Sequence, residues 1–161
     1  MATGEGVVTE VPDEDVDATI GASLALLGVV VRSLGSALEQ VTLPQYRALV
    51  VIAEHGPLRS GDLAEQLGVH QSTMTRTVDR LVAGGWAARQ VSPDSRREVM
   101  VGLTGRGHDL VAQVMEQRRR EVAQVLARAG ESDRRAIRTG LAAFAAAAGE
   151  PEPGELRSLG L

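Results

Sequence analysis

The chain has 161 residues with a formal net charge of −4, 43% hydrophobic residues, 2% aromatic residues and no cysteine. Such a chain fits one compact domain or two tightly fused subdomains, and its core must be built from Leu, Val and Ala, a composition that favours helices. The missing cysteine excludes disulfides, zinc–thiolate sites and thiol redox sensing. Because no segment has the pattern of a signal peptide and the apolar stretch 20–31 is too short to span a bilayer, we expect a cytoplasmic protein without membrane contact.

The acidity is concentrated near the N-terminus. Residues 1–41 carry seven acidic residues and one arginine, whereas 42–104 carry seven arginines and six acidic residues. Residues 105–161 carry nine arginines and eight acidic residues, so most of the chain is slightly basic. Every basic residue is arginine, whose planar fork suits phosphates and guanine edges, although a GC-rich genome would produce the same bias.

The N-terminal part is predicted as an acidic, disordered tail at 1–15 followed by a dimerisation segment at 16–42. Apolar residues recur at spacings of three and four between 17 and 40, which indicates a helix. This helix is apolar on more than one side, since Ala25, Val29 and Val30 lie off the main stripe. A helix of that kind must be buried nearly all round, and in so short a chain a second subunit is a natural way to bury it.

Seven further elements follow in chain order. Helices are predicted at 44–55, 60–67 and 71–83, then two strands at 87–91 and 98–103 that flank a hairpin turn. A long helix at 104–129 and a last helix that Ser132 N-caps and that ends near 148 complete the pattern. The expected fold is therefore mainly α with a small β-hairpin wing. Residues 43–104 form a winged helix-turn-helix, 105–148 supply further dimerisation helices, and 149–161 form a loose tail.

The helix at 71–83 has a face suited to reading DNA. Met74, Val78 and Leu81 form a stripe that packs inward. The opposite face has short hydrogen-bonding groups and arginine, which are the side chains used for base readout and phosphate contact. These candidate DNA contacts are Gln71, Ser72, Thr73, Thr75, Arg76 and Arg80. The alternative is an ordinary solvated face, but the Leu-Ala…Leu-Gly-Val turn before this helix argues against it.

The predicted hairpin adds positive charge beside that helix. Arg89 lies on the first strand, and Arg96 and Arg97 lie at the tip. A basic tip in this position can reach the adjacent minor groove, where arginine is attracted by the negative potential. Asp94 is better placed to pair with a neighbouring arginine and orient the turn. The alternative is a hydrophilic turn of the common Asp-, Pro- and Ser-rich kind.

Six short stretches, in this order and spacing, resemble the MarR family of bacterial transcriptional regulators. They are Leu43-Pro44-Gln45-Tyr46-Arg47-Ala48-Leu49, Leu63-Ala64-Glu65-Gln66-Leu67, Ser72-Thr73-Met74-Thr75-Arg76, Asp79-Arg80-Leu81, Asp94-Ser95-Arg96-Arg97 and Leu103-Thr104-Gly105-Arg106-Gly107. The resemblance implies a homodimer with interleaved terminal helices and two winged domains on one DNA face. It also implies that Ser72, Thr75 and Arg76 lie in the major groove and that Arg96 enters the minor groove.

The resemblance further implies a small-molecule crevice where the first helix, the second helix and the start of the long helix meet. The walls offered there are mainly apolar with a few polar groups, which is typical of a small-molecule site and points to an aromatic or phenolic acid. The candidates are Leu27, Val31, Tyr46, Arg47, Leu49, Val50, His108 and Val111. The alternative is that these residues are simply core.

Other site classes find little support in the sequence. The three histidines lie on separate segments without ligand-like spacing, and no phosphate loop or nucleophile motif is present, so we expect no metal, no cofactor and no enzyme activity. The run 118–120 of three arginines is interpreted as a solvated face that pairs with Glu116 and Glu121. The sequence therefore predicts a dimeric, ligand-responsive regulator, a repressor of a near-palindromic double-stranded DNA site. The alternative is a winged-helix protein-interaction module that binds no DNA.

Overall fold

A computed structural model describes residues 11–91 and 98–149. The described chain contains six helices and two strands: α1 (Asp13–Leu38), α2 (Leu43–His55), α3 (Ser60–Leu67), α4 (Gln71–Ala83), β1 (Ala87–Val91), β2 (Val99–Leu103), α5 (Gly105–Leu126) and α6 (Glu131–Ala147). The prediction of a mainly α fold with a β-hairpin wing is thereby confirmed. Asp94, Arg96 and Arg97, together with most of the two expected tails, lie outside the described residues.

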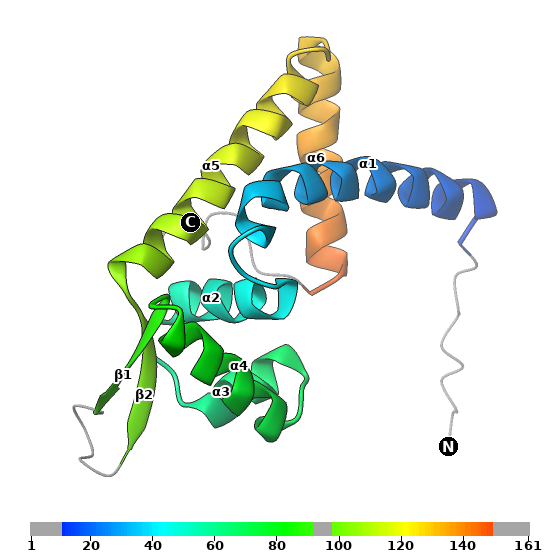
Figure 1. The fold of residues 1–161 in the computed structure, drawn as a ribbon. Helices are drawn as coiled ribbons and strands as arrows, with labels where there is room; N and C mark the ends of the chain where they lie inside the picture. The colour runs from blue at the N-terminus through cyan, green and yellow to red at the C-terminus, as the bar shows by residue number, and fades with distance from the viewer. Residues whose placement is uncertain (1–10, 92–97, 150–161) are drawn as a thin grey trace, which may run out of the picture.

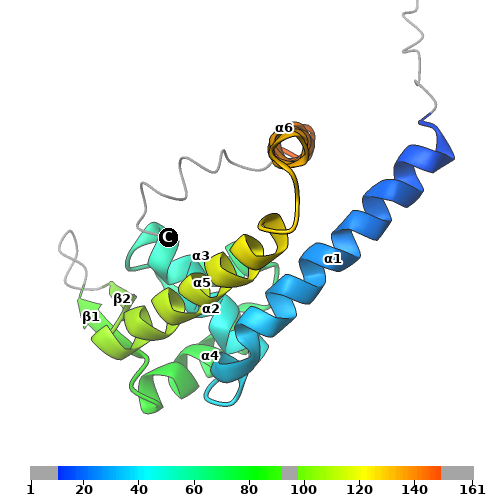
Figure 2. The same ribbon diagram turned by 90° about the horizontal axis from the view of Figure 1, so that it is seen from above.

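The helices α2, α3 and α4 pack together beside the β1–β2 hairpin, and α5 leads from the hairpin towards α6 (Figure 1). The C-terminal part of α1 packs on α5, whereas its N-terminal part projects away from the other elements (Figure 2). The core lies between the C-terminal end of α1, the helices α2, α3 and α4, strand β2 and the first half of α5. Its fully buried side chains include Leu49, Ile52, Leu63, Leu81 and Val101.

The wing is an antiparallel hairpin that is tied to the segment before α3. Ala87 pairs with Leu103 and Val91 pairs with Val99. Leu58 adds a one-residue antiparallel bridge on the other side of β2. Its N–H donates to the Val101 carbonyl (3.1 Å), and its carbonyl accepts from the Val101 N–H (2.7 Å). The position of β2 is therefore fixed from both of its edges.

The root of the wing is held by a close approach of α5 to Trp86. Thr104 is the N-cap residue of α5: its hydroxyl accepts from the Gly107 N–H (3.2 Å) and donates to the Gly85 carbonyl (2.7 Å). A Cβ on Gly107 would stand 2.2 Å from the Trp86 carbonyl oxygen, so only glycine fits there without a shift of backbone. Arg106 covers the Trp86 ring, with its guanidinium carbon 3.7 Å from the ring centroid.

Two helix starts differ from those expected from the sequence. α1 begins at Asp13, so the last residues of the expected disordered tail form its first turn. α6 begins at Glu131 with Gly130 as its N-cap residue, so the expectation that Ser132 caps this helix is wrong. In both cases acidic side chains occupy the first turn, where they interact favourably with the positive end of the helix dipole.

The N-terminal part of α1 and all of α6 expose apolar side chains. The largest exposed ones are Ile20, Leu24, Leu27 and Val31 on α1, and Ile137, Leu141 and Phe144 on α6. With 26 residues, α1 is also long and apolar enough to cross a membrane by length and composition, which corrects the expectation that no segment reaches that length. Core helices of soluble proteins meet the same criterion, so the property alone assigns no location.

Candidate nucleic-acid interface

A sharp turn between α3 and α4 fixes the direction of α4. Gly68 follows α3 in the left-handed conformation, with φ 64° and ψ 35°, and the Val69 N–H donates to the Ala64 carbonyl (3.0 Å). This is the usual way to end a helix on glycine. The chain then enters α4, whose Met74 and Val78 are buried against the core. The opposite face of α4 is consequently turned to solvent.

All six α4 residues predicted from the sequence lie exposed. They are Gln71, Ser72, Thr73, Thr75, Arg76 and Arg80. The Thr75 hydroxyl donates to the Gln71 carbonyl (2.9 Å), so its oxygen is left as an acceptor towards solvent. His70 occupies the N-cap position without a side-chain hydrogen bond to the helix. The face therefore offers hydroxyl, amide and guanidinium groups along an exposed helix.

Arg89, a predicted DNA contact, is engaged by α4 itself. Its Nη2 donates to Asp79 Oδ1 at 2.5 Å, which joins β1 to the middle of α4. A second ion pair, between Arg59 Nη2 and Glu98 Oε2 at 2.6 Å, joins the segment before α3 to the start of β2. Because Asp79 is paired, the positive charge of Arg76 and Arg80 is not offset by that carboxylate. The sequence pattern alone did not reveal these partners.

A pocket of about 380 Å³ lies between α1, α2, α3 and α5. Its volume and mostly apolar lining are those of a small-molecule site. Of the eight residues predicted to form the crevice, four line this pocket: Tyr46, Arg47, Val50 and Val111. The other four do not: Leu49 is fully buried in the core, and Leu27, Val31 and His108 are exposed elsewhere.

Several lining residues were missed by the sequence reasoning. They are Val30, Leu34, Glu54, Met115 and Arg118, together with apolar residues of α2 and α3. Helical spacing carries part of the signal, since Met115 and Arg118 follow Val111 by four and seven residues and so share its face. The α1 residues depend on how α1 crosses α5, which periodicity does not encode.

Tyr46 is the buried polar group of this pocket. It is 5% exposed, and its hydroxyl has no hydrogen-bond partner among the described residues. Burial raises the pKa of Tyr46 above its ordinary value of 10.0, Arg118 acts in the opposite direction, and Glu54 adds to the rise. An unsatisfied buried hydroxyl costs about 1–3 kcal/mol, so a ligand that forms a hydrogen bond to Tyr46 would recover that free energy on binding.

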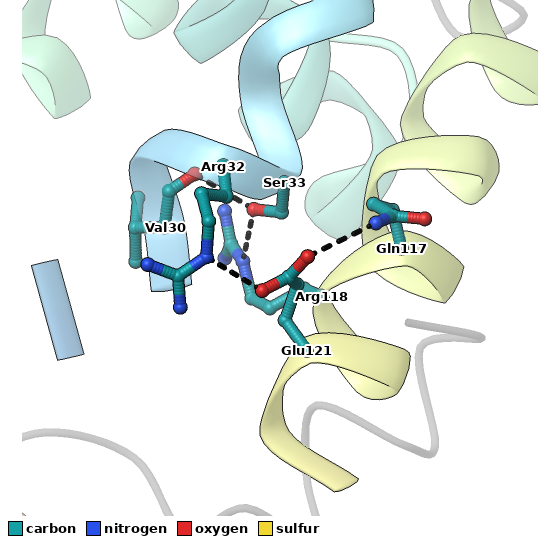
Figure 3. Close-up of polar contacts among 6 residues, drawn as sticks. All are labelled: Val30, Arg32, Ser33, Gln117, Arg118 and Glu121. Atoms are coloured by element: carbon teal, nitrogen blue, oxygen red, sulfur yellow. Dashed lines mark hydrogen bonds and ion pairs between the residues drawn. The ribbon is translucent and has the colours of Figure 1, made fainter. Parts of the chain in front are cut away.

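Polar contacts beside the pocket join α1 to α5 (Figure 3). Arg32 Nε donates to Glu121 Oε2 at 2.7 Å, and Gln117 Nε2 donates to Glu121 Oε1 at 3.3 Å. The buried Ser33 hydroxyl donates to the Val30 carbonyl (2.7 Å) and accepts from Arg118 Nε (3.3 Å). The interpretation of 118–120 as a solvated face thus holds for Arg120, which pairs with Glu116 at 3.2 Å, but not for Arg118.

Metal-ligating side chains do not gather in the described parts of the chain: within 11–91 and 98–149, no group of three or more His, Asp or Glu residues is placed to hold an ion.

A helix-turn-helix whose second helix is exposed and polar, followed by a two-stranded hairpin, defines the winged helix-turn-helix class. The sequence profile of the MarR family matches residues 41–99, which span this unit from the end of the α1–α2 connection into β2. The solved structure of RV1404 from Mycobacterium tuberculosis is 39% identical, with 93% of this chain and 100% of that chain covered and a TM-score of 0.80. The chain belongs to the MarR family of transcriptional regulators.

Two further relatives extend the comparison. The uncharacterized HTH-type transcriptional regulator YfiV of Bacillus subtilis is 29% identical over 101 residues, and the match covers 63% of each chain, so it spans less than two thirds of that relative. A MepR mutant of S. aureus, solved bound to an oligodeoxyribonucleotide, has the same fold with a TM-score of 0.60, at 17% identity over 86% of this chain and 99% of that chain. The curated relatives, YfiV among them, are HTH-type transcriptional regulators.

Proposed function

We propose that this protein is a sequence-specific, double-stranded DNA-binding regulator that acts as a homodimer on a near-palindromic operator. The observation that carries the proposal is the division of α4 into a buried apolar side and an exposed side of hydroxyl, amide and guanidinium groups. Major-groove readout uses these groups. The family membership supports the same conclusion, as does the DNA complex of MepR, a protein of the same fold.

Individual α4 residues have distinct proposed roles. Arg76 reads a guanine edge, and Ser72 contacts a base or a phosphate near the start of the helix. The Thr75 hydroxyl, whose proton is directed to the Gln71 carbonyl, accepts from the amino group of adenine or cytosine. Gln71, Thr73 and Arg80 contact the flanking backbone.

The wing is proposed to act in the adjacent minor groove. Arg96 and Arg97 supply the groove contacts and Asp94 orients the tip, all three being outside the described residues. Arg89 has a different role in this proposal: its ion pair with Asp79 holds the wing at a fixed angle to α4. Arg89 then contributes to DNA affinity by positioning the wing, and any direct contact with the DNA backbone adds to that effect.

The exposed apolar faces of α1 and α6 support an obligate dimer in the cytoplasm. In the proposed organisation, 16–42 and 105–148 are dimerisation segments and 43–104 is the DNA-binding domain. A second copy covers the exposed apolar stripe of each helix, and obligate interfaces of this kind are hydrophobic. Light scattering at micromolar concentration should show a dimer; a stable folded monomer, or a protein recovered only with lipid or detergent, would contradict this organisation.

The pocket beside Tyr46 is proposed as the effector site, and the response is proposed to be release from DNA by an aromatic or phenolic acid. A ligand shifts the protein between two spacings of the recognition helices only by its differential affinity for them. Half-sites on one DNA face lie about 34 Å apart, so a change of a few ångströms is sufficient to weaken binding. Thermal shift and DNA release measured together for a panel of such acids test this part.

Fluorescence anisotropy with a labelled duplex tests the DNA-binding proposal itself. The parent protein should bind a duplex from the upstream region of its own gene at least about 10³-fold more tightly than a scrambled duplex at physiological salt. Its apparent affinity for both duplexes should fall as salt increases, because phosphate contacts release counterions. Absence of binding to either duplex would favour the protein-interaction module instead.

A further inference from the structure

The pocket between α1, α2, α3 and α5 is lined by a half-buried arginine, Arg118, for which the described residues show no ion pair. We propose that Arg118 is the anion-recognition residue of this pocket, that the Ser33 hydroxyl positions it, and that the pocket takes a small organic monoanion whose acidic group contacts both the Arg118 guanidinium and the Tyr46 hydroxyl. The inference rests on the proposed effector role of the pocket, and it adds the residue that sets ligand charge.

The nearest acidic residue on the same helix is already engaged. Glu121 lies one turn beyond Arg118 on α5, but its two oxygens accept from Arg32 of α1 (2.7 Å) and from Gln117 (3.3 Å). Across 11–91 and 98–149, Arg118 forms no ion pair within 4.0 Å. Its charge is therefore available to a ligand, and charge-assisted hydrogen bonds in a partly buried site are stronger than neutral ones.

Ser33 fixes the direction of the guanidinium (Figure 3). This serine is 1% exposed, and its proton is directed to the Val30 carbonyl at 2.7 Å. Its oxygen can then only accept, and it does so from Arg118 Nε at 3.3 Å. One of the five donors of the guanidinium is thereby fixed on the α1 side, which leaves the terminal nitrogens for a carboxylate. A pre-oriented fork loses less conformational freedom when the ligand binds.

Tyr46 supplies the second contact for the acidic group. Its hydroxyl is buried without a partner in the described residues, and it lines the same pocket as Arg118. A carboxylate oxygen that accepts from this hydroxyl removes the cost of leaving it unsatisfied. The Tyr46 hydroxyl favours a ligand with a hydrogen-bond acceptor, and the Arg118 guanidinium favours a negative charge on that acceptor.

The remaining lining sets the size of the charge and the nature of the rest of the ligand. Arg47 is exposed at the pocket and Glu54 opposes it, so with Arg118 the lining carries a net charge of +1. That balance favours a monoanion over a dianion or a cation. The other walls are apolar, with Val30, Leu34, Val111 and Met115 among them. The body of the ligand is correspondingly apolar.

Isothermal titration of the full-length protein with 1-naphthoate and with its neutral isostere 1-naphthamide tests the inference. The parent should bind the carboxylate at least about tenfold more tightly, which corresponds to about 1.4 kcal/mol. Arg118→Gln should remove this preference, and Arg118→Lys, which keeps the charge but not the fork, should restore it only in part. Ser33→Ala should weaken carboxylate binding about two- to tenfold without affecting the carboxamide, and Ser33→Thr, which keeps the hydroxyl, should retain it.

Two further variants separate a local effect from a general charge effect. Arg120→Gln makes the same charge change on the exposed side of α5, where Arg120 pairs with Glu116, and should leave both ligands unaffected. Glu54→Gln should strengthen carboxylate binding only. The far-ultraviolet circular dichroism spectrum and melting temperature of each variant check that it is folded, and Arg118→Lys carries the test if Ser33→Ala does not fold.

The inference is overturned if the parent binds neither probe, if it binds both equally, or if Arg120→Gln reduces the preference as much as Arg118→Gln does. An equal loss of both probes in Ser33→Ala would overturn the positioning role of Ser33. The DNA-binding proposal can fail separately. A parent protein that prefers the carboxylate but binds no duplex would support the role of Arg118 and contradict the proposed function as a DNA-binding regulator.

Discussion

Gly107→Ala is expected to destabilise the protein strongly, although it places alanine in a helix. Gly107 lies in the first turn of α5 and faces the Trp86 carbonyl. A Cβ there would lie 2.2 Å from the carbonyl oxygen and 3.2 Å from the carbonyl carbon. To reach an ordinary contact distance, the backbone at Trp86 must withdraw by about 1 Å, because nothing flexible lies in between.

That withdrawal disturbs contacts that hold the wing on the domain. The Trp86 carbonyl accepts from the Thr104 N–H at 3.1 Å, and the Trp86 ring is buried beneath Arg106. Overpacking of this kind costs about 1–3 kcal/mol, and loss of the hydrogen bond adds about 1 kcal/mol. The higher helix propensity of alanine offsets up to about 1 kcal/mol. The expected net loss in the free energy of unfolding is therefore about 1–4 kcal/mol.

Urea unfolding followed by circular dichroism measures this loss. All variants are compared at one protein concentration, because the stability of the proposed dimer depends on concentration. Gly105→Ala is the matched control: it lies in the same turn and its Cβ would meet nothing within 4 Å. It should be neutral or stabilising by up to about 1 kcal/mol. If Gly107→Ala is as stable as Gly105→Ala, the close approach of α5 to Trp86 is not a structural constraint and the reasoning is wrong.

Three other predictions concern the wing, the pocket and their links to α4. Arg96→Ala should weaken specific and scrambled duplexes to similar extents and reduce the salt slope by about one unit, as anisotropy at several salt concentrations will show; an unchanged slope would contradict a groove contact. Asp79→Asn should lower the free energy of unfolding by less than about 1 kcal/mol in urea, because the ion pair of Asp79 with Arg89 is exposed. The same variant should weaken DNA binding, because the wing is no longer held to α4 by this ion pair. Unchanged DNA affinity in Asp79→Asn would contradict the proposed positioning role of Arg89. Tyr46→Phe should not lower stability at pH 7, since the hydroxyl has no partner among the described residues. Burial raises the folded-state pKa of Tyr46, so the unfolded chain loses the phenolic proton first as the pH rises. The parent should therefore lose stability as the pH rises from about 10 through that raised pKa, and Tyr46→Phe should lose less over the same range. Unfolding curves whose pH dependence is the same for the two proteins would contradict this.

The winged unit was predictable in detail because its signals are local. The bounds of α3 and α4 follow from apolar spacing together with the glycines that end them, Gly68 and Gly84. The split of α4 into two faces follows from the same spacing, since one turn of helix fixes which residues share a side. Such signals need no knowledge of how distant segments pack.

The pocket was only partly predictable because it depends on the crossing of three helices. Of the α2 residues that the resemblance implied, Tyr46 and Val50 line the pocket, whereas Leu49 turns inward to the core. On α1 the prediction chose Leu27 and Val31, one turn too early, because the point where α1 meets α5 is set by long-range contacts such as Arg32 with Glu121. Arg118 was taken for a solvated residue because its partner lies on another helix.

The most direct test of the DNA-reading face of α4 compares Arg76→Ala with a matched control in anisotropy titrations on the upstream duplex. Arg76 is exposed on that face, and Arg135, which pairs with Glu131 on α6, provides the same loss of charge away from it. Arg76→Ala should lower the affinity for the specific duplex by about 1–3 kcal/mol and relax the preference at one base pair, while Arg135→Ala binds like the parent. Equal affinities for the two variants would contradict the claim that α4 reads DNA.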